Sequence, residues 1–152
     1  METNLKTITI IAFFGLFIVN ETKAQSAFEA GVRIGDAFNS FSIDATFPLS
    51  KAPRLHSAFY LNDGFDLGLY FDWMFSLDGG PQGLKFYPGL GPELYFGNDF
   101  NLGIAGDFGV EYSFKIPLTI GIDYRPGFMV TDGFNFYGGN WGILARFRFV
   151  KA

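Results

Sequence analysis

The alternation of large apolar side chains with small or charged ones is the feature that most limits how this chain can fold. It is clearest in residues 102–114, LGIAGDFGVEYSF, where every large apolar side chain falls on one parity. The other parity carries glycine together with Ala105, Asp107, Glu111 and Ser113. Because successive side chains of an extended strand point to opposite faces, this stretch predicts one strand with an apolar face and a face of glycines and carboxylates.

The same rhythm continues along the chain, and no helical period of any length accompanies it beyond the N-terminal segment. Clusters of Gly, Pro, Asn and Asp interrupt it about every ten residues, as expected of strands joined by tight turns. We therefore expect eight strands in one domain, at about 27–36, 41–48, 54–61, 65–76, 85–96, 102–114, 118–128 and 140–150. Pro88 and Pro92 fall inside the fifth strand, where they remove ladder donors, and we expect a bulge or a delayed start there.

Such strands fit two folds: a soluble sheet protein with the apolar face in its core, and a membrane barrel with the apolar face toward lipid. The composition of the two faces distinguishes these folds. The polar face is mostly glycine with isolated charges, which suits the narrow lumen of an eight-stranded barrel. The apolar face carries aromatic side chains on nearly every strand, as a lipid-facing surface does. Only 17% of the residues are charged and 20% are aromatic, 21 of them Phe, which is little charge for a soluble surface. The sequence thus predicts an all-β fold, an eight-stranded antiparallel up-and-down transmembrane β-barrel.

Parity then assigns the charged residues to the lumen and the large apolar residues to the lipid. An arginine facing lipid at the bilayer midplane costs about 2–4 kcal/mol, and buried charges need partners of opposite sign. The predicted lumen network consists of Glu29, Arg33, Glu93, Asp107, Glu111, Asp123, Arg125, Arg146 and Arg148. The predicted lipid-facing band consists of Phe28, Phe47, Phe59, Leu69, Phe71, Trp73, Leu94, Ile104, Phe108, Ile122, Tyr124, Ile143, Phe147 and Phe149. We expect Asp66 and Asp72 near a wet rim.

The N-terminal segment has the three parts of a secretory signal peptide. Lys6 precedes the apolar run 8–19, and Thr22 and Ala24 are small residues at the −3 and −1 positions of a cleavage site. We expect a signal peptide over 1–24 and an outer-membrane barrel domain over 25–152. The chain has no Cys, so a disulfide framework and a lipid-modified cysteine are excluded, which suits a bacterial envelope better than a disulfide-stabilised secreted protein.

Lysines give the barrel a predicted orientation. Lys51, Lys85, Lys115 and Lys151 all fall in turns or at strand ends. Counting strands from a periplasmic N-terminus places all four on the periplasmic side, whereas the opposite connections lack Lys and Arg and carry Asp and Asn.

The last hairpins resemble a known family. GVEYSFKIPLTIGIDYRPGF (109–128) and NWGILARFRFV (140–150) look like the closing hairpins of small outer-membrane β-barrel proteins of the OmpA/OmpX-like type. The RFRF segment resembles the aromatic-ending signal read by the barrel-insertion machinery, although three residues follow Phe149, where the family often ends on the aromatic residue. The resemblance implies location in the outer membrane of a Gram-negative cell, contact with membrane lipid, and the insertion machinery as a partner during biogenesis.

Few residues are candidates for chemistry. His56 is the only histidine, and its neighbour Ser57 lies on the opposite strand face, which excludes a Ser–His dyad between them. One His and no Cys leave only carboxylates as further metal ligands, so no metal site is expected. The glycine-rich stretches are followed by no helix that could hold a phosphate, so no cofactor is expected. A net charge of −4 argues against nucleic acid.

These observations predict a plugged, salt-bridged barrel with a structural or adhesive role, without catalysis. The 127–140 loop is the candidate site for a surface partner, although a plain extended hairpin closed at 131–133 explains this connection equally well. Two alternatives stay open at this point. One is an outer-membrane enzyme that modifies lipid A through His56, and the other is a soluble periplasmic barrel that binds lipid in an apolar lumen.

Overall fold

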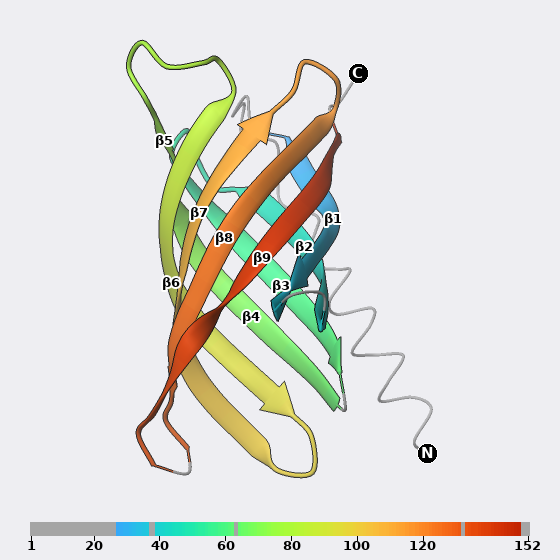
Figure 1. Cartoon of the computed structure of the whole chain (residues 1–152), viewed down its shortest axis with the longest axis vertical. Coiled ribbons are helices and arrows are strands. Elements are labelled where there is room, and N and C mark those ends of the chain that lie inside the picture. The colour runs from blue at the N-terminus through green and yellow to red at the C-terminus, as the bar shows by residue number, and fades with distance from the viewer. Residues whose placement is uncertain (1–26, 37–38, 63, 132, 150–152) are drawn as a thin grey trace.

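A computed structural model describes residues 27–36, 39–62, 64–131 and 133–149, and these residues form one closed antiparallel β-sheet (Figure 1). The strands are β1 (Phe28–Gly35), β2 (Ser40–Pro48), β3 (Pro53–Asn62), β4 (Gly64–Trp73), β5 (Phe75–Ser76), β6 (Leu84–Phe96), β7 (Phe100–Ser113), β8 (Leu118–Met129) and β9 (Asn135–Phe149). No helix among the described residues is long and apolar enough to cross a membrane. The predicted signal peptide and Lys151 lie outside the described residues.

The sheet closes into an eight-stranded up-and-down barrel, which confirms the predicted fold class. Strands adjacent in sequence pair antiparallel, and β1 pairs with β9 from Phe28–Phe149 to Gly35–Gly142. β5 continues β4, because both pair with β6 in one register. Phe71 of β4 pairs with Leu90, and Phe75 of β5 pairs with Phe86. The two labels therefore belong to one strand of the barrel wall. It is interrupted at Met74, whose N–H donates to the Ala52 carbonyl at 3.0 Å.

The two prolines of β6 lie where its ladder with β4 and β5 is open. Pairing with β4 is absent between Gly68–Glu93 and Phe71–Leu90, which is where Pro92 falls. Pro88 falls at the interruption between β4 and β5. The expected bulge or delayed start is therefore wrong, because β6 runs through both prolines and the missing donors coincide with gaps in its pairing with β4 and β5. The bulge of this barrel lies instead between β8 and β9, at Arg125/Gly127 around Pro126.

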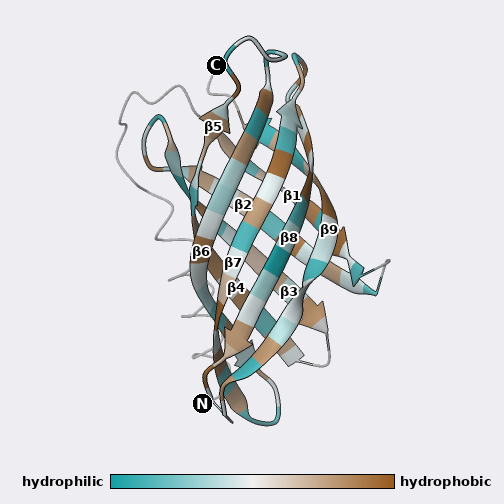
Figure 2. Ribbon diagram, turned by 60° about the vertical axis from the view of Figure 1, so that its left-hand side comes forward, coloured by the Kyte–Doolittle hydropathy of each residue, from teal (hydrophilic) through white to brown (hydrophobic). Residues whose placement is uncertain are grey.

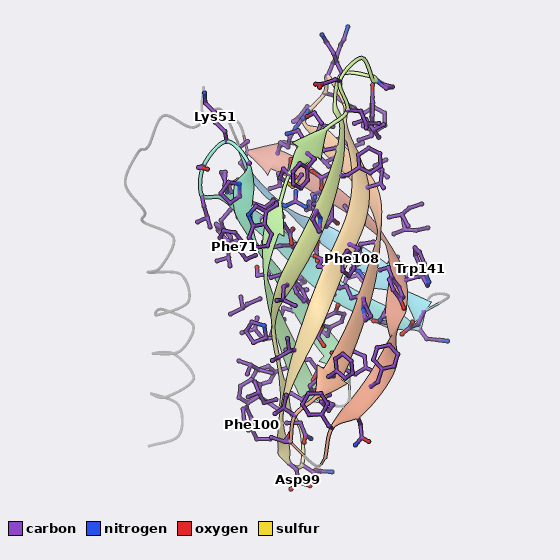
Figure 3. The ribbon with its side chains drawn as sticks, turned by 90° about the vertical axis from the view of Figure 1, so that its left-hand side faces the viewer. Lys51, Phe71, Asp99, Phe100, Phe108 and Trp141 are labelled. Atoms are coloured by element: carbon purple, nitrogen blue, oxygen red, sulfur yellow. The ribbon has the colours of Figure 1, made fainter. Side chains whose placement is uncertain are left out.

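Every long strand presents one face to the lumen and one to the outside. In β2, Ser42, Asp44 and Thr46 are buried, whereas Phe41 and Ile43 are exposed. Figure 2 shows this alternation as hydrophilic and hydrophobic bands along the strands. Figure 3 shows Phe71 and Trp141 at the outer edges of the barrel, and Phe108 is likewise exposed. The interior of the barrel is thus polar, and its outer surface is apolar.

The barrel wall is taller on one side than on the other. β1 and β2 have 8 and 9 residues, whereas β7 and β9 have 14 and 15. The β6–β7 and β8–β9 hairpins therefore reach beyond the β1–β2 and β3–β4 connections (Figure 1). For the 127–140 connection the extended-hairpin alternative is confirmed: β9 begins at Asn135 rather than near 140, because Phe136 pairs with Phe128 and Tyr137 with Gly127.

The two ends of the barrel differ in charge. The lysine end contains the connections at 49–52, 77–83 and 114–117, with Lys51 and Lys115 exposed. The acidic end contains the connections at 36–39, 97–99 and 130–134. Lys51 and Asp99 mark these opposite ends in Figure 3.

Candidate functional site: the charged lumen

A cluster of buried charged side chains fills the lumen, and every strand of the wall contributes to it apart from the two-residue β5. Each of these residues occupies the inward parity of its strand, and glycines on neighbouring strands leave room for the longer side chains. A Cβ at Gly142, for example, would overlap the Arg33 guanidinium. The buried charged residues of the described chain are Glu29, Arg33, Asp44, Arg54, His56, Asp72, Glu93, Asp107, Glu111, Asp123, Arg125 and Arg146.

Arg146 and Arg54 organise the half of the cluster nearer the lysine end. The Arg146 guanidinium donates to Glu29 at 3.0 Å, to Asp44 at 3.2 Å and to Glu111. Arg54 donates to both oxygens of Glu111 at 2.9 Å and to Asp72 at 3.0 Å. Glu111 thus bridges two arginines that come from opposite sides of the barrel.

Arg33 and Arg125 organise the half nearer the acidic end. Arg33 pairs with Asp123 at 2.6 Å and donates to the Asn140 carbonyl at 2.9 Å. Arg125 pairs with Asp123 at 2.9 Å and with Asp107 at 3.2 Å, and it donates to the Tyr60 hydroxyl at 2.8 Å. Such bonds offset the cost of removing these charges from water, which an unpaired charge could not do.

His56 lies between the two halves, and both of its ring nitrogens face carboxylates. Nε2 lies 2.7 Å from Asp44, while Nδ1 lies 3.0 Å from Asp72 and 2.7 Å from Asp107. The Arg125 guanidinium is 3.2 Å from Nε2. His56 is fully buried, as are these three aspartates.

Tyrosines complete the packing of the lumen. Tyr70 and Tyr137 both donate to Glu93, the one acid of the cluster without an arginine partner. The Arg54 guanidinium lies 4.4 Å from the centre of the Tyr87 ring, and Arg125 lies 4.9 Å from that of Tyr70. These are cation–π distances, at which a ring face attracts a guanidinium.

Most of the predicted lumen network is brought together, with two exceptions in its bonding. Glu93 is buried but bonds to tyrosines. Arg148 is half-buried at the lysine end, where it donates to the backbone carbonyls of Phe114 and Ile116. The other seven predicted members form ion pairs or hydrogen bonds with one another or with their lumen neighbours: Glu29, Arg33, Asp107, Glu111, Asp123, Arg125 and Arg146.

The cluster has four further members outside the predicted network: Asp44, Arg54, His56 and Asp72. The expectation that Asp72 lies at a wet rim is wrong, because it pairs with Arg54 across β3–β4 and is fully buried. Asp66 is half-buried and lines an open cavity of about 390 Å³ at the acidic end. The inward parity of 54–60, with Arg54, His56 and Tyr60, was the signal that could have found the missing residues.

None of the predicted lipid-facing residues is buried. All fourteen lie on the outward parity and are half-buried or exposed. Aromatic rings gather toward both ends of this face. At the lysine end Phe28 packs against Phe47 and Phe149, with ring centroids 4.9 and 5.3 Å apart. At the acidic end Phe96 packs against Phe65 and Phe100, with centroids 4.6 and 5.4 Å apart.

The His56 environment contains no serine dyad. Ser57 lies on the outward parity and its hydroxyl donates to the Ala45 carbonyl at 3.4 Å. Among the described residues no Ser or Thr hydroxyl is hydrogen-bonded to His56; its ring partners are Asp44, Asp72 and the Arg125 guanidinium.

Comparison with known proteins identifies the fold. No family model matches the sequence, and no curated protein sequence matches it. A solved structure that does match is the solution NMR structure of the de novo designed protein TMB2.3, a designed transmembrane β-barrel. The match has a TM-score of 0.56 at 13% sequence identity and covers 86% of this chain and 100% of the designed chain. At this identity the likeness shows the fold alone, a closed antiparallel β-barrel, which in this chain has eight strands.

Proposed function

We propose that this chain is an integral β-barrel of a bacterial outer membrane whose lumen is plugged by its ion-pair network, and that it has a structural or surface-interaction role without catalysis. One observation carries the proposal: the distribution of polarity is the reverse of that in a soluble protein. Thirty large hydrophobic side chains of the described residues are exposed, while four arginines, His56 and seven acids are buried.

The exposed apolar surface is the argument for lipid. Soluble monomers rarely expose contiguous apolar patches larger than a few hundred square ångströms. Here such side chains surround the whole wall, and aromatic clusters near both ends are placed like the girdles at membrane interfaces. A lumen lined by charges offers no site for an apolar ligand, which argues against the soluble lipid-binding barrel.

The two cavities at the ends of the barrel support a plugged lumen. The cavity at the lysine end has a volume of about 840 Å³ and is lined by Lys51, Arg54 and Glu111 among others. The cavity at the acidic end is lined by Glu93 and Arg125 among others, and the two have no lining residue in common. Between them lies the layer of His56 and its aspartates, all fully buried.

The β8–β9 hairpin is the element we propose for contact with a surface partner. It projects beyond the shorter walls, and its tip exposes Phe134 by 77% and Phe136 by 59%. With the lysine end in the periplasm, as the lysine positions favour, this tip faces outward from the cell.

Fractionation and conductance together test the proposal. After expression in a Gram-negative host, the chain should fractionate with the outer membrane and migrate differently on a gel before and after boiling. In planar bilayers it should show no stable conductance of porin size, and the mass of lipid A should be unchanged. Extraction without detergent would overturn the membrane location. A porin-sized conductance would overturn the plug, and a lipid A modification lost in His56→Ala would establish the enzyme instead.

A further inference from the structure

The side chains around His56 Nδ1 have the composition of a metal site. The imidazole nitrogen and the carboxylates of Asp72 and Asp107 each offer one ligand atom, and these atoms lie within 4.8 Å of one another. The three residues come from β3, β4 and β7, so the closed barrel brings them together although they are far apart in the sequence. One imidazole with carboxylate oxygens is a ligand set that suits divalent ions such as Zn²⁺ or Mn²⁺.

The hydrogen bonds behind these groups match those that usually support metal ligands. A metal-bound histidine almost always donates its second ring N–H to a carboxylate or carbonyl, and His56 Nε2 lies 2.7 Å from Asp44. Each of the two other candidate ligands is held by an arginine: Arg54 donates to Asp72 at 3.0 Å and Arg125 to Asp107 at 3.2 Å.

One carboxylate oxygen that faces His56 Nδ1 has no hydrogen-bond partner. It is Oδ2 of the fully buried Asp107, whereas the unpartnered Oδ1 of Asp72 is directed toward Gly89. Asp107 Oδ2 lies 2.7 Å from His56 Nδ1 without forming a hydrogen bond, while Asp72 Oδ2 lies 3.0 Å from the same nitrogen. A single proton on Nδ1 can be donated along only one of these directions, whereas a cation can be bound by both carboxylates together.

The charge balance of the lumen also calls for a cation. Four arginines (Arg33, Arg54, Arg125, Arg146) face seven acids (Glu29, Asp44, Asp72, Glu93, Asp107, Glu111, Asp123) among the buried described residues. Buried charge without compensation is costly, and a divalent ion compensates more of it than one proton on His56 does.

We propose that His56, Asp72 and Asp107 bind one divalent transition-metal ion in the centre of the lumen, with Asp44 orienting the imidazole. The Nδ1–oxygen separations of 2.7 and 3.0 Å are shorter than the ligand spacing of about 3.3–3.6 Å that metal–ligand bonds of about 2.0–2.2 Å imply in a tetrahedral site, so an ion that replaces the Nδ1 proton has to move the carboxylates apart by about 0.3–0.9 Å. The proposal departs from the expectation that a chain with one His and no Cys lacks a metal site, because the barrel supplies the other ligands from distant strands.

Zinc content after refolding tests the site. Because the ligands are buried, the ion has to enter as the barrel closes, so the chain is refolded in detergent with Zn²⁺ and then desalted. We expect about one Zn²⁺ per chain, and less than a tenth of that in His56→Gln and Asp107→Asn. Asp44→Asn should weaken binding about 10- to 100-fold, as loss of a supporting carboxylate does. Glu93→Gln is the matched control, since Glu93 is a buried lumen acid bonded to tyrosines, and it should retain the ion.

Equal zinc in the wild type and in folded His56→Gln would mean adventitious ions only and would overturn the site, as would a wild type that retains none. Heat-modifiable migration checks that each variant folds. Where a variant does not fold, X-ray absorption spectroscopy of the zinc-loaded wild type identifies the zinc ligands instead. Coordination by one imidazole and by oxygens supports the site, and a shell of oxygens alone overturns it. The result is independent of the membrane proposal, which is tested by fractionation and conductance.

Discussion

At the scale of single residues, the lumen is stabilised by arginines that each serve several carboxylates. Arg146 is the clearest case, because its three donor nitrogens reach Glu29, Asp44 and Glu111 on three different strands. Removing one member of such a cluster leaves the others buried without their counter-charge. The loss of folding free energy exceeds the net contribution of the intact pair, because the remaining charges are still buried away from water but have lost their partner.

Arg146→Leu should therefore be strongly destabilising. We expect the free energy of unfolding to fall by about 3–5 kcal/mol, the usual cost of breaking a buried ion pair by removing one partner. Arg148→Leu is the matched control, since Arg148 is two residues away on the same strand face but only donates to turn carbonyls. Urea unfolding of both variants in lipid vesicles measures the difference. A similar small loss in both would show that the lumen network does not stabilise the barrel.

At the scale of elements, the β4–β6 seam depends on a close approach of two backbones. Pairing is missing there between Gly68–Glu93 and Phe71–Leu90. Gly91 lies in this gap, and a Cβ at its position would overlap the Leu69 carbonyl oxygen. Only glycine lets the two strands come this close, so the seam is more sensitive to an added methyl group than the turns are.

Gly91→Ala should weaken the pairing of β4 with β6. Forcing a methyl group against backbone costs about 1–3 kcal/mol or more, so we expect less of the heat-modifiable folded form and a lower urea midpoint. Gly97→Ala, in the β6–β7 turn, provides the control because a Cβ there meets nothing within 4 Å. Should the two variants unfold at the same midpoint, the seam would not be the sensitive element.

Strand parity could be predicted from sequence far better than strand pairing. Alternation within 102–114 or 118–128 is local, so both faces of each strand follow from the residues themselves. Asp72 was misplaced because its partner Arg54 lies on another strand, and the register that joins them is absent from either segment alone. The start of β9 stayed open between 140 and an extended hairpin for the same reason, since Phe136 becomes strand by pairing with Phe128. The His56 cluster depends on the register of three strand pairs, and no local pattern encodes it.

At the scale of the whole molecule, the barrel resembles a soluble fold with its two faces exchanged. The lumen contains the polar groups that a soluble protein leaves in water, and the outer wall carries the side chains that it buries. On the proposed membrane location its stability depends on the solvent around it, because lipid would accept the outer wall while the lumen charges are paired with one another. Replacing an outward apolar residue with a charged one should thus destabilise a barrel in a membrane but not a barrel whose outer wall faces water.

Ile122→Arg distinguishes these two settings. Ile122 is 54% exposed near the middle of β8, and an arginine facing lipid at the midplane costs about 2–4 kcal/mol, decreasing to about 0–1 kcal/mol near the interface. Ile116→Arg, in the turn at the lysine end and 61% exposed, is the control and should be nearly neutral. Folding of both variants is measured by urea titration in vesicles. Comparable stabilities for the two would mean that the middle of the outer wall faces water, because only a bilayer makes the cost of a charge depend on its depth.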